Sequence, residues 1–93
     1  GNGNMMLSIE NRSFTQRPQI DDKGQQAGKV AVEFRVNQSG VIIYARAGVK
    51  GTTITDPSLL EKCERAVRGA RLNQLANAPD SQTGRIVFNF KLR

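Results

Sequence analysis

The stretch KVAVEFRVN, residues 29–37, alternates between apolar and polar side chains with a period of two. Successive side chains of a strand point to opposite faces, so this period predicts a β-strand with one buried and one solvated face. The final stretch, GRIVFNFKLR, has the same alternation and predicts a strand over 85–92. The buried faces of these two strands carry Val30, Val32, Phe34, Val36, Ile86, Phe88, Phe90 and Leu92. A chain with two such strands has to form a sheet and cover one of its faces.

A hairpin is predicted directly after the first of these strands. The letters NQSG form a turn signal in which Gly40 is free to take a positive φ. A strand over 41–47 follows, and its alternation is broken because Ile42 and Ile43 are both apolar. An extra residue in one strand of an antiparallel pair has this effect, so a β-bulge is predicted here.

A helix is predicted after the hairpin. Asp56 precedes Pro57, which places an N-cap acceptor directly before a proline at the first helical position. The residues that follow form an apolar stripe with helical spacing, made of Leu59, Leu60, Cys63, Ala66, Val67 and Ala70. We expect this stripe to lie on the sheet, with Cys63 as a small buried hydrophobic residue rather than a reactive thiol.

The predicted order of elements makes the chain an α+β domain with a β-β-α-β core. The strand over 85–92 pairs antiparallel with the strand over 29–37, so the three-stranded antiparallel-type sheet has the order second, first, last. The helix covers one face of this sheet, and the other face is solvated. A weakly alternating segment over 7–13 predicts an extra N-terminal strand. The last strand therefore lies at an edge of the sheet unless this N-terminal segment pairs with it.

Length and composition limit the function classes. The 93 residues correspond to one domain, with 1–4 interpreted as a linker or tag remnant and 5–93 as the domain, whose core is 28–93. The chain has no His and one Cys, which excludes Ser-His and Cys-His nucleophile pairs and imidazole metal ligands. We therefore expect no enzymatic activity, no metal and no cofactor. The net charge of +6 favours acidic partners.

Three blocks of the sequence resemble the C-terminal domain of TonB, the energy transducer of Gram-negative bacteria. They are GKVAVEFRVNQSGVI, DPSLLEKCERAVRGARL and TGRIVFNFKLR, and the similarity covers residues 28–93. The stretch AGVKGTTITDPSLLEKCERAV is especially similar to the TonB-type domains of Bacteroidetes. The fold of that family is β-β-α-β, which agrees with the fold predicted from the residues alone.

The resemblance implies a mechanical role. Family domains bind the TonB box, a short peptide of an outer-membrane TonB-dependent transporter, by adding it as a strand beside their own last strand. An ExbB–ExbD complex supplies energy from the proton-motive force through the N-terminal part of such proteins. The resemblance thus implies a periplasmic domain that serves nutrient import and is anchored to the inner membrane through an upstream segment.

The resemblance also implies particular site residues. The peptide-binding edge strand would consist of Arg85, Ile86, Val87, Phe88, Asn89, Phe90, Lys91 and Leu92. A receptor contact is implied for Gln16, Arg17 and Pro18, although Arg17 stands where many members have Tyr. Basic side chains on the last strand either attract acidic partner residues or protect the edge from aggregation. An unpaired edge strand would also allow a homodimer.

Two alternatives stay open beside this interpretation. In the first, the same fold is a partner-recognition domain appended to another membrane protein, such as a metallopeptidase-type sensor. In the second, the basic charge marks a small nucleic-acid-binding domain. The second is the weaker, because the solvated faces of the strands over 29–37 and 85–92 offer no aromatic side chains for base stacking. No nucleic-acid partner is therefore expected.

Overall fold

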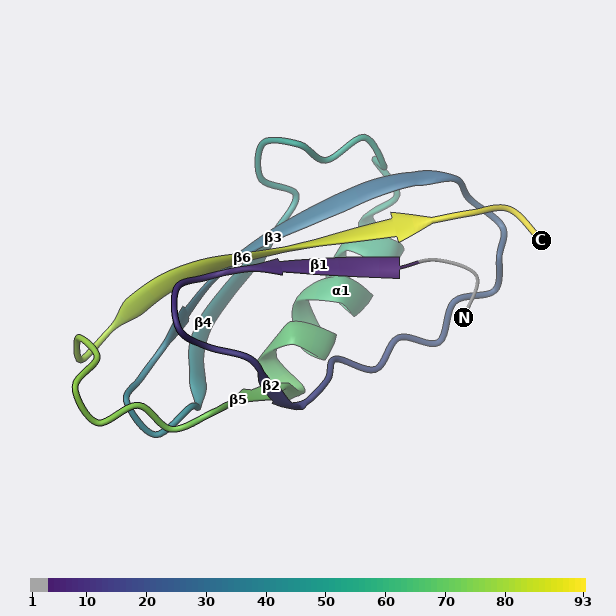
Figure 1. Ribbon diagram of the computed structural model, residues 1–93. Coiled ribbons are helices and arrows are strands. Elements are labelled where there is room, and N and C mark those ends of the chain that lie inside the picture. Colours follow the sequence, from purple (N-terminus) through teal and green to yellow (C-terminus); the bar gives the residue numbers. More distant parts are fainter. Residues whose placement is uncertain (1–3) are drawn as a thin grey trace.

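The computed structural model describes residues 4–93, in which a helix packs on one face of an antiparallel sheet (Figure 1). The elements, in chain order, are β1 (Asn4–Ser8), β2 (Phe14–Gln16), β3 (Gly28–Val36), β4 (Ile42–Ala47), α1 (Pro57–Gly69), β5 (Arg71–Leu72) and β6 (Gln82–Phe90). Asn4 belongs to β1 and not to the linker predicted over 1–4. Residues 1–3 of that predicted linker lie outside the described residues.

The main sheet has the strand order β1-β6-β3-β4, and all its pairs are antiparallel. The predicted α+β class, the β-β-α-β core and the order second, first, last are confirmed, since β4, β3 and β6 are the three predicted strands. The central pair is the longest, because β3 and β6 are in register at every position from Gly28↔Phe90 to Val36↔Gln82. A second, short pair joins β2 to β5.

The predicted extra N-terminal strand is present and lies on the outer side of β6. β1 pairs with β6 from Asn4↔Asn89 to Ser8↔Arg85. The prediction that residues 85–92 form an edge strand is therefore wrong, and β6 is an interior strand. The pairing occurs because Met5 and Leu7 become half-buried on the core side of the sheet, next to Phe88 and Ile86.

The bounds predicted for two strands need correction. The N-terminal strand does not cover 7–13, because the chain turns at Glu10 and Asn11, where Asn11 has a φ of 60°. Strand β6 begins three residues earlier than predicted and ends at Phe90, opposite the first residue of β3. With no β3 partner left, Leu92 is 65% exposed and is not part of the core face.

The predicted bulge is confirmed on β4. Arg35 pairs with Tyr44 and Val36 pairs with Ile42, which leaves Ile43 as the extra residue. A bulge shifts the alternation of the strand, so Ile43 and Tyr44 are both exposed, while Ile42 is buried.

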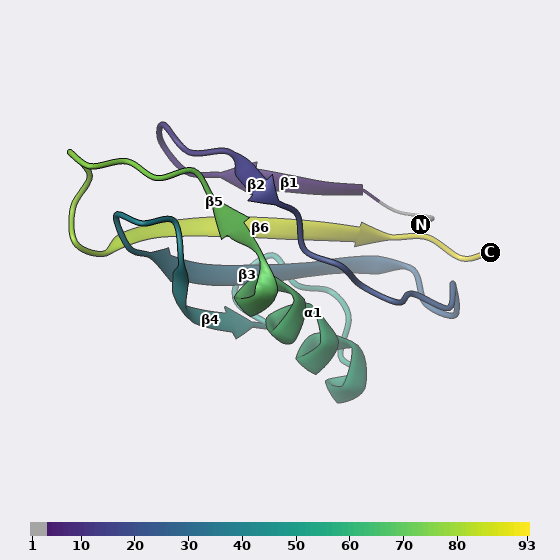
Figure 2. The same cartoon turned by 90° about the horizontal axis from the view of Figure 1, so that it is seen from below.

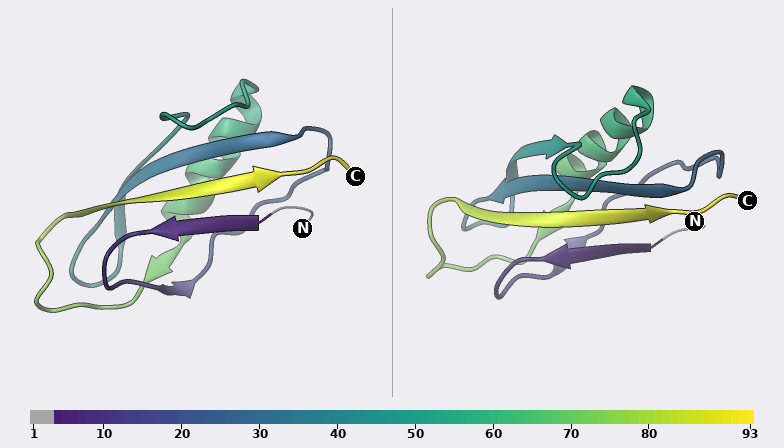
Figure 3. Two further views of the ribbon diagram at one scale, coloured as in Figure 1. Left: turned by 45° about the horizontal axis from the view of Figure 1, so that its top comes forward. Right: turned by 90° about the horizontal axis from the view of Figure 1, so that it is seen from above.

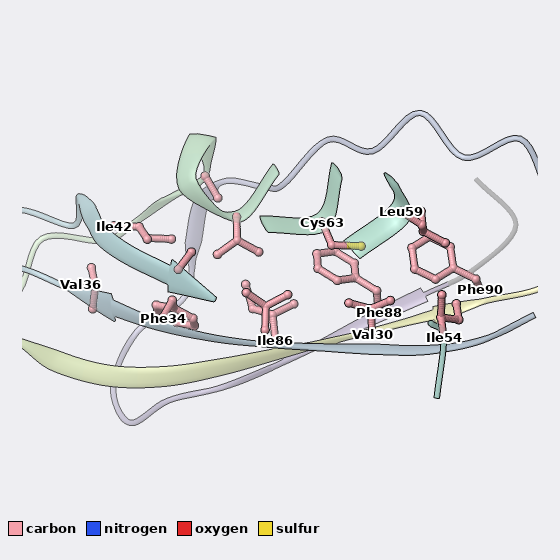
Figure 4. Close-up of a cluster of buried hydrophobic side chains, with 14 of the residues drawn as sticks. Val30, Phe34, Val36, Ile42, Ile54, Leu59, Cys63, Ile86, Phe88 and Phe90 are labelled. Atoms are coloured by element: carbon pink, nitrogen blue, oxygen red, sulfur yellow. The ribbon is translucent and has the colours of Figure 1, made fainter. Parts of the chain in front are cut away.

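The core lies between the sheet and two covering elements. α1 begins where predicted, since the Asp56 side chain accepts a hydrogen bond from the Ser58 N–H. Figure 4 shows Leu59 and Cys63 of the helix on the side that faces Phe88 and Phe90. The extended segment 17–27 runs beside α1 on the same face of the sheet (Figure 2). It carries the partly buried Ile20 into the core cluster.

The opposite face of the sheet is only partly solvated. The loop after β4 crosses β3 on this side (Figure 3). The N–H groups of Gly48 and Val49 donate to the carbonyl oxygen of Ala31, and the Ala31 N–H donates to Thr52 Oγ1. Ala31, which the alternation assigned to the solvated face, is fully buried as a result. The remaining part of this face is not covered by the loop. We refer to it as the open face, and it carries the side chains of Lys29, Glu33, Arg35, Arg46 and Arg85.

Candidate functional site

The structure brings together two of the sequence segments that the resemblance implicated. A shallow hollow of about 250 Å³ lies between segment 17–22 and the end of the sheet formed by β1 and β6. Its lining includes Arg17, Pro18, Phe88, Asn89 and Phe90. Residues about 70 positions apart in sequence thus share one surface depression beside the strand predicted to bind a peptide.

The three residues of the predicted receptor contact have different surroundings. Pro18 is buried, so it holds segment 17–22 in place. Arg17 is exposed, and its guanidinium carbon lies 5.7 Å from the centroid of the Phe14 ring. Gln16 ends β2 and lines a different depression, of about 400 Å³, that faces α1. Arg17 lines both depressions and is therefore the member of this group best placed to contact a partner.

The residues predicted as the binding strand divide into three groups. Ile86, Phe88 and Phe90 are buried in the core. Arg85, Val87 and Asn89 are half-buried and alternate with them on the other face. Lys91 and Leu92 follow the end of β6 and are exposed. The backbone of residues 85–89 pairs with β3 on one side and with β1 on the other. A peptide can pair with β6 only in the position that β1 occupies.

Arg85 has a structural role in addition to its predicted one. Its Nη2 donates to the carbonyl oxygen of Lys50 at 2.5 Å, which ties β6 to the loop that crosses β3. Gly51 is favoured at this point because its φ of 104° lies in a region that residues with a side chain rarely adopt. One N–H group of this guanidinium is therefore already engaged within the chain.

The two edges of the main sheet differ in how they are protected. The helix covers the outer edge of β4: the Ala47 N–H donates to Glu64 Oε1 at 3.0 Å, and Arg68 Nη2 donates to the Ala45 carbonyl oxygen at 3.2 Å. Glu64 and Arg68 also pair with each other at 3.5 Å. For the outer edge of β1, no such bond is present within residues 4–93. The available edge is therefore the β1 edge.

The single cysteine of the chain lies in the core. Cys63 is fully buried, as predicted, and burial raises the pKa of its thiol to about 12, with a further contribution from the Asp22 carboxylate. Within residues 4–93, no group of three His, Cys, Asp or Glu side chains is arranged to hold a metal ion. No helix of this part of the chain has the length and apolar character needed to cross a membrane.

One buried charged residue, Arg12, is not predicted by any pattern in the sequence. Arg12 is 7% exposed, and its Nε donates to Gln82 Oε1 at 3.0 Å while Nη1 donates to the Asn73 carbonyl oxygen at 2.9 Å. These bonds connect the turn after β1 to the start of β6 and to the loop after β5. Arg12 thereby holds the turn after β1 against the start of β6. Its position in a polar turn segment resembles that of any solvated Arg, so no pattern distinguishes it.

Comparison with known proteins adds no relative: no protein-family model, no curated protein and no solved structure matches the chain.

Proposed function

We propose that this chain is a TonB-type domain that binds a short extended peptide by strand addition to β6, with the peptide taking the place of β1. The observation that carries the proposal is the position of β1, a five-residue strand with no fully buried residue, on the outer edge of β6. A peptide bound in this way obtains its affinity from backbone hydrogen bonds and makes loose demands on sequence.

β1 is the strand of the main sheet that is easiest to replace. It pairs with β6 at five positions, whereas β3 pairs with β6 at nine. Its apolar contribution to the core cluster consists of the half-buried Met5 and Leu7, while β3 contributes four fully buried side chains. Local opening requires less free energy where few apolar contacts are lost, so β1 should separate from β6 well before β3 does.

The hollow beside β1 would receive a side chain of the bound peptide. Phe88 and Phe90 contribute apolar lining, and Arg17 and Asp22 contribute charges of opposite sign. A peptide with an apolar residue beside polar ones suits this combination, because an apolar pocket with a few polar groups fixes the orientation of a ligand.

The partner that we propose is the TonB box of an outer-membrane TonB-dependent transporter. In this role the domain lies in the periplasm, is anchored to the inner membrane through an upstream segment, and transmits the work of an ExbB–ExbD complex to the transporter. Pairing along a strand suits a pulling load, because several backbone hydrogen bonds have to break together.

The test is a titration of the isotope-labelled domain with a TonB-box peptide, followed by amide hydrogen exchange. We expect chemical shift changes along β6 and a loss of exchange protection in β1, with β3 unchanged. The matched control is the same peptide with a central proline, which cannot donate a backbone hydrogen bond and should bind more weakly.

Two results would contradict the proposal in different ways. The absence of shifts in both β1 and β6 at millimolar peptide would exclude strand addition. Shifts in β1 with its protection retained would show that the peptide adds outside β1, so that the replacement of β1 is wrong.

A further inference from the structure

We propose that the open face of the main sheet is a second interaction surface, which docks an acidic protein surface. It is separate from the β1 edge and does not depend on the proposed peptide binding. Strands β6, β3 and β4 contribute side chains to it in register, and the loop after β4 bounds it on one side (Figure 3).

Positive charge is concentrated on this face. The side chains of Lys29, Arg35, Arg46 and Arg85 alternate with buried neighbours and therefore lie on it, together with the single acid Glu33. Four positive charges and one negative charge give +3, which is half of the net charge of +6 of the whole chain. A concentration of one sign of charge attracts a partner of the opposite sign.

These basic groups are not neutralised within the described residues. The three ion pairs found there are Lys23–Asp21 in the loop before β3, and Arg65–Glu61 and Arg68–Glu64 on α1. Glu33 stands in register between Arg85 on β6 and Arg46 on β4, but it forms no ion pair within 4 Å with either. Both arginines of the helix are thus paired with acids, while none of the basic residues on the open face is.

Apolar side chains lie among these charges. Met6 is 68% exposed and is in register with Val87. Ile43 is 55% exposed because the bulge turns it out of the core, and Tyr44 is exposed beside it. Protein–protein interfaces are enriched in Arg, Met and aromatic residues, which is the combination that this face presents.

A protein partner fits these observations better than a nucleic acid does. Tyr44 is an aromatic residue on this face, but its ring is already covered by Arg35, whose guanidinium carbon lies 5.4 Å from the ring centroid. An acidic protein surface can instead place its carboxylates on the arginines and an apolar side chain on Ile43.

The test is a titration of the labelled domain with a short synthetic peptide that is rich in Glu with interspersed Leu. We expect amide shifts concentrated at residues 33–35 and 44–46. Arg46→Glu should weaken binding about tenfold or more, because it places like charges opposite each other. The matched control is Arg65→Glu, which makes the same charge change on the helix and should leave the affinity nearly unchanged.

The proposal fails if Arg65→Glu weakens binding as much as Arg46→Glu does, since the attraction would then come from net charge alone. It also fails if a single-stranded oligonucleotide of matched charge shifts the same amides with higher affinity than the peptide at physiological salt. Binding of the TonB-box peptide by the Arg46→Glu variant provides the separation from the proposed function, because it should remain at the level of the unmodified domain.

Discussion

Gly84 is a residue at which one added methyl group should be strongly destabilising. A Cβ there would lie 2.4 Å from Phe34 Cζ, and Phe34 is fully buried and cannot move aside. We expect Gly84→Ala to lower the free energy of unfolding by about 1–3 kcal/mol, the range for overpacking a core. Denaturant unfolding measures this. Gly69→Ala is the control, because no heavy atom lies within 4 Å of its added Cβ, and it should cost nothing. Equal losses in both variants would contradict the argument.

Because of Cys63, the free energy of unfolding should change with pH in the alkaline range. Burial raises the pKa of its thiol from 9.0 to about 12. The unfolded chain therefore loses this proton at a lower pH than the folded chain does. The contribution of the buried, protonated thiol to the free energy of unfolding is fully present below about pH 9. The free energy of unfolding should fall as the pH rises from there towards 12.

The measurement for Cys63 is denaturant unfolding at neutral and at alkaline pH, compared with Cys63→Ala. Other groups titrate in the same range, so the informative quantity is the difference between the two proteins. We expect Cys63→Ala to be less stable at neutral pH, with a smaller further loss at alkaline pH. Parallel pH profiles for the two proteins would show that the thiol is not the cause.

At the scale of elements, the start of α1 depends on one carboxylate. Asp56 Oδ1 accepts a hydrogen bond from the Ser58 N–H at 3.1 Å, and Oδ2 accepts one from Gln26 Nε2 at 2.7 Å. We expect Asp56→Ala to lower the free energy of unfolding by about 1–2 kcal/mol, the loss typical of an N-cap. Asp56→Asn keeps a capping oxygen and should lose much less. If the two variants are equally destabilised in thermal unfolding, the cap is not the stabilising contact.

The elements that the sequence predicted well are those with a local cause. The alternation over 29–37 and 85–92 identified β3 and β6, the pair Asp56–Pro57 placed the start of α1, and the doubled isoleucines at Ile42 and Ile43 marked the bulge. Each of these signals comes from side chains close together in the sequence, which is why the sequence alone was sufficient.

The elements that the sequence predicted poorly depend on distant partners. β1 forms because β6 offers it an edge, and the turn that directs it there is held by Arg12, whose partners Asn73 and Gln82 lie more than 60 residues away. The two-residue β5 exists only as the partner of β2. The hollow lined by Arg17 and Phe88 likewise depends on residues that are far apart in the sequence. For this reason the sequence predicts that β6 forms the outer edge of the sheet, whereas in the structure β1 forms it.

For the whole molecule, the unequal protection of the two sheet edges predicts how it associates with itself. The β4 edge is occupied by Glu64 and Arg68, whereas the β1 edge has no such cover within residues 4–93. We expect association at high concentration through antiparallel pairing of β1 with its copy, because an unpaired strand edge is a template for another strand. Sedimentation velocity over a concentration series measures it.

A lysine on the β1 strand should prevent this association. Met6 is largely exposed, so Met6→Lys should leave the monomer as stable as before while its charge opposes its copy across the new pair. Ile43→Lys is the matched control on β4, whose edge the helix already occupies, and it should not change the association. If Ile43→Lys prevents association equally well, the contact lies on the open face and not at the β1 edge. A chain that stays monomeric at millimolar concentration would show that the twist or side chains of β1 protect its edge without the help of a covering element.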